Sequence, residues 1–185
     1  MQNRLKTKEL VLTALLIALG IVIPVCFSFL RVVLPPAFTA TLMAHVPVFI
    51  AMFISPFSAL FTALGTAIGF FFTSDPVVAA RAASHVVFAL VGAFMIKKRC
   101  NLILAGVVTA LLHALCEALV VLLFLGMGWT ENKTGAPIVA IAFYTTGVGT
   151  LIHDAIDYVI ACGVGFALVK AKAIPPIPHL WKNGE

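Results

Sequence analysis

Charged residues are scarce in this sequence. They make up 10% of its 185 residues, whereas 62% of the residues are hydrophobic. Soluble domains carry about 25% charged residues, so this composition excludes a soluble globular protein. A membrane β-barrel is excluded as well, because segments of roughly ten alternating residues are missing and the apolar runs are long and unbroken. The sequence therefore predicts an integral membrane protein made of helices.

Motifs typical of enzymes and metal sites are missing too. The sequence contains no HExxH motif, no Walker A motif and no CxxC pair. The four cysteines are Cys26, Cys100, Cys116 and Cys162, and three of them lie in apolar stretches. Such cysteines favour packing in the protein interior over metal or disulfide chemistry. We expect no enzymatic activity, no metal site and no cofactor in this chain.

The length of the chain suits one membrane domain, residues 1–185. At about 20 residues per span, it has room for roughly six or seven helices. We predict an all-α bundle of six transmembrane helices, preceded by a short basic segment at 1–8 and followed by a proline-rich tail at 173–185. The predicted spans cover residues 9–28, 38–54, 57–72, 76–96, 102–125 and a last span ending near 170. Whether residues 138–144 begin that last helix stays open.

Basic residues are distributed unevenly between the two predicted sides of the membrane. One side holds Arg31 and Lys133, and the side of the two termini holds Arg4, Lys6, Lys8, Lys97, Lys98, Arg99, Lys170, Lys172 and Lys182. Under the positive-inside rule, both termini are therefore cytoplasmic. The net charge of +5 reflects this topology, and we expect contact with membrane lipid but no nucleic-acid partner.

Ionisable residues recur four positions apart in three predicted spans. The pairs are Arg81 and His85, His113 and Glu117, and His153 and Asp157, the last with Asp154 beside it. Ionisable residues within a membrane nearly always face the protein interior or a wet cavity, because exposure to lipid is costly. With the predicted topology, the three pairs converge on a pocket that opens to the outside, below the polar loop at 126–135.

This pocket predicts a binding site for a small acid, because a guanidinium matches a carboxylate in a bidentate geometry. The candidate substrate-binding residues are His45, Arg81, His85, His113, Glu117, Trp129, Asn132, Lys133, His153 and Asp157. Capture of a ligand is favoured over conduction, since the inner halves of the spans are apolar.

Structural roles are the alternative for these residues. Arg81 could pair with Asp75 or extend to the membrane interface, and His45 could be a buried histidine of the core. The pairs His113 with Glu117 and His153 with Asp157 could hold helices together, or their four side chains could bind zinc, iron or nickel. Trp129 and Tyr144 also fit an interfacial aromatic belt. Two other functions stay open: a proton-coupled carrier that uses the His, Asp and Glu residues of the last two spans, and a structural protein.

Small residues recur four positions apart in the first and third predicted spans. Ala14 and Ala18 share one face, and Gly65 and Gly69 form a GxxxG pair. Both spacings are typical of close helix packing in membranes.

Three stretches together resemble a known family. They are Ala14-xxx-Ala18, the segment FTATLMAHVPVFIAMFISP at 38–56 and the segment ARAASHVVFALVGAF at 80–94. In these stretches, and over residues 5–172 as a whole, the sequence resembles the substrate-binding S components of energy-coupling-factor (ECF) vitamin transporters. These are six-helix proteins of the bacterial cytoplasmic membrane with a vitamin pocket near the outer face.

The resemblance implies several roles. Ala14 and Ala18 would dock on a transmembrane coupling subunit that sits on two ATPase subunits, and these partners would use the ATP. The connection at 29–37, with Arg31, Pro35 and Pro36, would act as a gate over the pocket. Nickel and cobalt members have an early histidine where this chain has Gln2, which argues against metal. The vitamin would be a carboxylate, niacin first and pantothenate second, before a neutral one such as pyridoxine.

Overall fold

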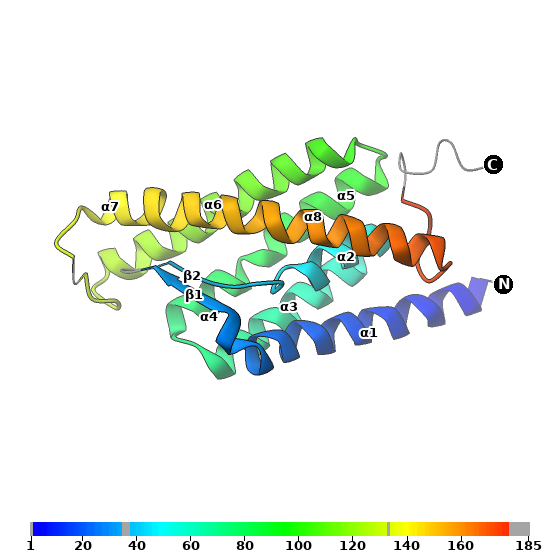
Figure 1. Ribbon diagram of the computed structural model, residues 1–185, viewed down its shortest axis with the longest axis horizontal. Coiled ribbons are helices and arrows are strands. Elements are labelled where there is room, and N and C mark those ends of the chain that lie inside the picture. The colour runs from blue at the N-terminus through cyan, green and yellow to red at the C-terminus, as the bar shows by residue number, and fades with distance from the viewer. Residues whose placement is uncertain (1, 35–37, 133, 178–185) are drawn as a thin grey trace.

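Five helical segments in the described part of the chain are long and apolar enough to cross a membrane. The computed structural model describes residues 2–34, 38–132 and 134–177. The five segments are Lys6–Cys26, Pro56–Thr73, Pro76–Lys97, Leu102–Gly126 and Ile138–Lys170. They lie roughly along one axis and form a bundle, with a small β-hairpin in the half of the bundle away from the two ends of the chain (Figure 1). The fold is thus mostly helical, as predicted.

The close packing of α1 (Gln2–Cys26) on α3 (Pro56–Thr73) depends on glycine. A Cβ atom on Gly65 would lie 2.8 Å from Ile17 Cγ2, and one on Gly69 would lie 2.9 Å from Ile21 Cα. Real side chains do not approach so closely, so the absence of a side chain lets the two backbones meet. The GxxxG pair therefore has the packing role that its spacing indicates.

The prediction of a transmembrane helix over residues 38–54 is wrong. Residues Phe38–Thr41 form strand β2, and the helix α2 covers only Val46–Ile54. Its 9 residues span about 13 Å at 1.5 Å per residue, less than half of a hydrocarbon core. Eight of the nine side chains are buried inside the bundle. A helix that is apolar on all sides can be enclosed by protein as well as by lipid, and composition does not separate the two.

A β-hairpin follows α1 and corrects the prediction that the protein is entirely helical. After the short helix η1 (Ser28–Leu30), strand β1 (Arg31–Leu34) pairs with β2 in antiparallel register, so that Arg31 lies opposite Thr41. The turn between the strands contains Pro35 and Pro36, which lie outside the described residues. Strand β1 is largely exposed, whereas β2 buries Phe38 and Thr41. The hairpin therefore places one strand against the bundle interior.

The predicted fourth span consists of two helices, α4 (Pro76–Ala83) and α5 (His85–Lys97), which meet at Ser84. The hydroxyl of Ser84 donates a hydrogen bond to the carbonyl oxygen of Arg81 at 2.7 Å. The break places Arg81 in the last turn of α4 and His85 at the start of α5. The two side chains consequently lie where the helix changes direction.

The last two spans follow the predicted boundaries. Asn101 caps α6 (Leu102–Gly126), since its side-chain oxygen accepts a hydrogen bond from the Ile103 N–H at 2.7 Å. After the polar loop, α7 (Ile138–Ala140), the π-helical segment η2 (Ile141–Val148) and α8 (Gly149–Lys170) follow one another without a break. Residues 138–144 therefore belong to the last helical segment.

The beginning of α1 and the end of α8 lie at the same end of the bundle (Figure 1). The ammonium group of Lys8 donates a hydrogen bond to the carbonyl oxygen of Lys172 at 2.5 Å. The turn between α2 and α3 lies there too, because the hydroxyl of Ser55 donates a hydrogen bond to Glu9. The half-length α2 thus returns the chain to the side on which α1 begins.

Candidate functional site

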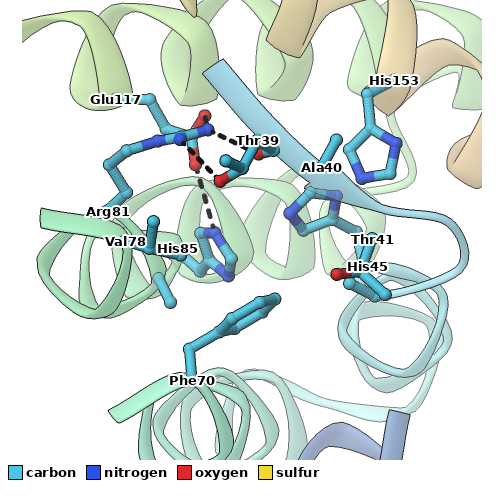
Figure 2. Close-up of a pocket in the computed structure, with 12 residues that line it drawn as sticks. Thr39, Ala40, Thr41, His45, Phe70, Val78, Arg81, His85, Glu117 and His153 are labelled. Atoms are coloured by element: carbon cyan, nitrogen blue, oxygen red, sulfur yellow. Dashed lines mark hydrogen bonds and ion pairs between the residues drawn. The ribbon is translucent and has the colours of Figure 1, made fainter. Parts of the chain in front are cut away.

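Eight ionisable side chains gather in the interior of the bundle. None exposes more than 7% of its surface, and they are His45, Arg81, His85, His113, Glu117, His153, Asp154 and Asp157. They come from the start of α2 and from α4, α5, α6 and α8. Figure 2 shows five of them around a small cavity beneath the hairpin. The three polar spans predicted from the sequence therefore do share one site.

Arg81 connects α4 to α6 and to the hairpin. Its Nη2 atom lies 2.7 Å from Oε2 of Glu117 and donates a second hydrogen bond to the Thr39 carbonyl oxygen at 3.2 Å. The guanidinium carbon also lies 5.8 Å from the centre of the Phe38 ring, which is close enough for a cation–π contact. The carboxylate partner of Arg81 is thus Glu117 on another helix.

Several polar side chains surround the carboxylate of Glu117. Thr150 on α8 donates a hydrogen bond to Oε2 at 2.5 Å. Its other oxygen, Oε1, lies 3.4 Å from Nε2 of His113 and 3.7 Å from Nε2 of His85. Those two distances exceed an ordinary hydrogen bond, so Oε1 contacts both imidazoles without a close partner among them.

His45 lies at the centre of a cluster of four histidines. Its ring centroid is 4.7 Å from those of His85, His113 and His153, and the rings meet edge to face. On the α8 side, Oδ2 of Asp154 lies 2.9 Å from Nδ1 of His113. Each histidine therefore contacts another imidazole, and ring nitrogens of four histidines gather in one place.

Asp157 fixes the position of His45. Its two carboxylate oxygens accept hydrogen bonds from the backbone N–H groups of Met43 and His45, both at 3.0 Å. Met43 has a φ of 69°, a left-handed conformation that a non-glycine residue seldom adopts, and it turns the chain from β2 toward α2. The carboxylate at the N-terminal end of α2 also interacts favourably with the helix dipole. Asp157 thereby joins α8 to the start of α2.

The cavity has a polar side and an apolar side. Arg81, Glu117 and the histidines lie on one side, and Phe70 faces them from α3 (Figure 2). The lining residues are Thr39, Ala40, Thr41, Ala44, His45, Phe70, Val78, Arg81, Ala82, His85, Glu117 and His153. Its volume of about 20 Å³ holds roughly one water molecule. With the hairpin in this position, the cavity is closed to a larger ligand.

The polar loop residues of the predicted site do not line this cavity. Trp129 is 69% exposed and packs its ring against Phe124, with 5.3 Å between ring centroids. The side chain of Asn132 is exposed and donates a hydrogen bond to the Ala136 carbonyl oxygen at 2.7 Å. Lys133 lies outside the described residues. The two described side chains therefore stabilise the loop, whereas the other seven candidates lie in the buried cluster.

Asp154, which belongs to the cluster, and Thr150 and Thr39, which lie beside it, were not among the predicted substrate-binding residues. Asp154 contacts His113, while Thr150 and Thr39 bind Glu117 and Arg81. Thr150, Asp154 and Asp157 are spaced at i, i+4 and i+7, so one face of a helix carries all three. That periodicity was visible in the sequence. Thr39 had no such signal, because it lies on a strand of the hairpin.

The comparisons with known proteins give one informative match. No protein-family profile and no solved structure matches the chain. Over 180 residues, however, the chain is 35% identical to the niacin transporter NiaX of Lactococcus lactis subsp. cremoris (strain MG1363), a match that covers 93% of this chain and 79% of the relative. The chain belongs to the NiaX family.

Membership in the NiaX family confirms the resemblance to niacin-type S components of ECF transporters. The chain is accordingly a vitamin transport protein and not an enzyme. Together with the five membrane-spanning segments, the match also confirms a multi-pass protein of the cell membrane.

Proposed function

We propose that this chain is the niacin-binding S component of an ECF-type importer, which captures the vitamin from outside the cell. The observation that carries this function is the buried cluster around Arg81, closed by the β-hairpin, in a member of the NiaX family. Pantothenate, which also carries a carboxylate, is the second candidate ligand. A neutral vitamin would leave the guanidinium of Arg81 without an additional partner.

The chemistry of the cavity suits a flat aromatic acid. A carboxylate would bind on the side of Arg81 and His85, whose side chains line the cavity (Figure 2). The ring would pack against Phe70 and Val78 on the apolar side. Binding pockets typically combine an apolar lining with a few polar groups that fix orientation.

Entry of the ligand requires the hairpin to move. A one-ring acid is several times larger than the space now present, and strand β2 forms the roof of the cavity. Contacts of Arg81 with Thr39 hold the hairpin on the bundle. Within the hairpin, Nε of Arg31 donates a 3.4 Å hydrogen bond to the Thr41 hydroxyl and joins the two strands. We propose that the segment with Arg31, Pro35 and Pro36 acts as the gate, and that these polar contacts close it.

The partners would be a transmembrane coupling subunit and two ATPase subunits, which supply the energy from ATP. Ala14 and Ala18 are both exposed on α1, and Leu10, Val11 and Leu15 beside them are exposed as well. Small side chains on an apolar helix face permit another helix to approach closely. With cytoplasmic termini, the hairpin and the cavity would face the outside.

Calorimetry on the purified protein tests the function directly. Niacin should bind with one site per chain and without ATP, and nicotinamide should bind much more weakly because it lacks the carboxylate. Pantothenate and pyridoxine complete the panel. If no carboxylate vitamin binds, the proposed function is wrong.

Reconstitution separates this function from a proton-coupled carrier. Liposomes that contain only this chain should not accumulate niacin under a pH gradient, whereas a carrier that uses Glu117, His153 and Asp157 would accumulate it. Accumulation by the chain alone would refute the dependence on partner subunits.

A further inference from the structure

The buried cluster contains more carboxylates than permanent cations. Glu117, Asp154 and Asp157 expose no more than 4% of their surface, and Arg81 is the guanidinium beside them. If all three acids are ionised, two negative charges remain without a permanent counter-charge within the cluster. Uncompensated charges in a protein interior cost several kcal/mol each. Protonated histidines or a bound cation would offset that charge.

The same cluster contains nitrogen atoms that lack hydrogen-bond partners. Within the described part of the chain, Nδ1 of His45, Nδ1 of His85, Nε2 of His113 and Nε2 of His153 are buried and have no hydrogen bond of suitable geometry. A carboxylate oxygen lies 3.4 Å from three of these nitrogens, those of His45, His113 and His153. Buried polar atoms nearly always have partners, so four such nitrogens in one cluster need an explanation. Neutral imidazole nitrogens are common ligands of divalent transition metals.

Three of the histidines are close enough to share one ion. His45, His85 and His113 each offer a nitrogen, and these three atoms lie within 4.8 Å of one another. Ligands at about 2.0–2.1 Å from a tetrahedral zinc ion are about 3.4 Å apart, so each nitrogen needs to move by less than about 1 Å. Small rotations of the side chains are sufficient for such a shift.

Glu117 and Asp154 complete this geometry. Glu117 Oε1 lies 3.4 Å from Nε2 of His113, which matches the spacing of about 3.4 Å between two ligands of one ion. Nδ1 of His113 lies 2.9 Å from Oδ2 of Asp154. A neutral His113 that donates from Nδ1 to this carboxylate has the lone pair of Nε2 free to bind a metal ion. Carboxylates commonly orient metal-binding histidines in this way.

We propose that His45, His85 and His113 bind one divalent transition-metal ion, of which zinc is the best match, with Glu117 beside it. The ion would supply two positive charges beside these carboxylates. This differs from the expectation of no metal site, because the three ligands come from α2, α5 and α6 and leave no sequence motif. An ion next to the cavity would also favour an acidic ligand, a consequence that rests on the proposed function.

Another group, His45, His153 and Asp157, has similar spacing. It is less suitable, because both oxygens of Asp157 already accept backbone hydrogen bonds. The two groups share His45, so mutation of the other members distinguishes them.

Metal titration of the full-length protein in detergent tests the site. After removal of metals with a chelator, the wild-type protein should bind one equivalent of Co²⁺ with the visible absorption of a four-coordinate ion, and Zn²⁺ should displace it. His85→Ala and His113→Ala should weaken binding by roughly 100-fold, and Asp154→Asn by about 10-fold, because Asp154 acts through His113. His153→Ala should still bind one equivalent. His179→Ala, which changes the one histidine of the sequence beyond the described residues, is the control for binding elsewhere on the chain.

The outcomes are distinguishable. No stoichiometric binding to the wild-type protein refutes the site, whether or not the variants fold. If His153→Ala loses metal binding and His113→Ala retains it, the ion belongs to the group of His45, His153 and Asp157. If all cluster variants retain metal binding, the metal binds only at the surface. Either result overturns the proposed site. Niacin calorimetry with and without chelator separates the two hypotheses: metal uptake without vitamin binding refutes the proposed function alone, and vitamin binding without metal uptake refutes the metal site alone.

Discussion

Arg81 Nη2 lies 2.7 Å from Glu117 Oε2, and both side chains are buried at the centre of the bundle. The pair joins α4 to α6, and the same guanidinium holds the hairpin through Thr39. An acidic ligand that binds Arg81 must therefore share it with Glu117 and with the hairpin. The pair therefore contributes to the stability of the bundle, to ligand binding and to closure by the hairpin.

Arg81→Ala should reduce both niacin affinity and stability. Affinity should fall roughly 10- to 100-fold, as expected for loss of a charged hydrogen bond, and the free energy of unfolding should fall by about 3–5 kcal/mol because Glu117 loses its buried partner. The double variant Arg81→Met, Glu117→Gln should recover most of the stability but not the affinity. Calorimetry and thermal unfolding measure the two effects. Unchanged affinity in Arg81→Ala would exclude a direct contact with the ligand.

Thr39→Val should speed the release of niacin. The substitution removes the hydroxyl that accepts a 3.4 Å hydrogen bond from Nη1 of Arg81, and so loosens the hairpin. Loss of one such contact, worth about 1 kcal/mol, should raise the dissociation rate by roughly 5-fold. Thr39→Ser keeps the hydroxyl and is the control. Dissociation of radiolabelled niacin measures the rate, and equal rates for both variants would argue against closure by this contact.

Ala14→Trp should leave niacin binding unchanged but abolish uptake when the coupling and ATPase subunits are present. A large side chain on this exposed face of α1 would obstruct the approach of a partner helix. Leu19→Trp, at a residue that is 48% exposed on another side of the same helix, should retain uptake. Normal transport by Ala14→Trp would place the docking surface elsewhere, and loss of binding would mean that α1 affects the pocket.

Gly69→Ala should destabilise the bundle. The new methyl group would lie 2.9 Å from the backbone of Ile21 and would force α1 and α3 apart. Overpacking of this kind typically costs about 1–3 kcal/mol. Gly163→Ala is the matched control, because nothing lies within 4 Å of its added Cβ. A thermal unfolding temperature in Gly69→Ala as high as in the control would contradict close packing of these helices.

The sequence by itself identified the class of protein and most of the cluster. Hydropathy is a property of each segment, so the long apolar runs revealed the membrane helices without knowledge of their neighbours. Helical periodicity is equally local, and spacings of four residues placed Arg81 with His85, His113 with Glu117, and His153 with Asp157. The polar loop predicted Trp129 and Asn132 as binding residues, yet both lie away from the cluster. A polar loop and a polar pocket contain the same residue types, so composition does not distinguish them.

Only the tertiary structure decided which of these side chains meet. Residues 38–54 are as apolar as a span, yet they form a strand and a short helix, because enclosure by protein favours the same residues as lipid does. Arg81 pairs with Glu117, which lies 36 positions away in the sequence. The four-histidine cluster depends on the packing of α2, α5, α6 and α8. Contacts between separate elements follow from packing and leave no local pattern in the sequence.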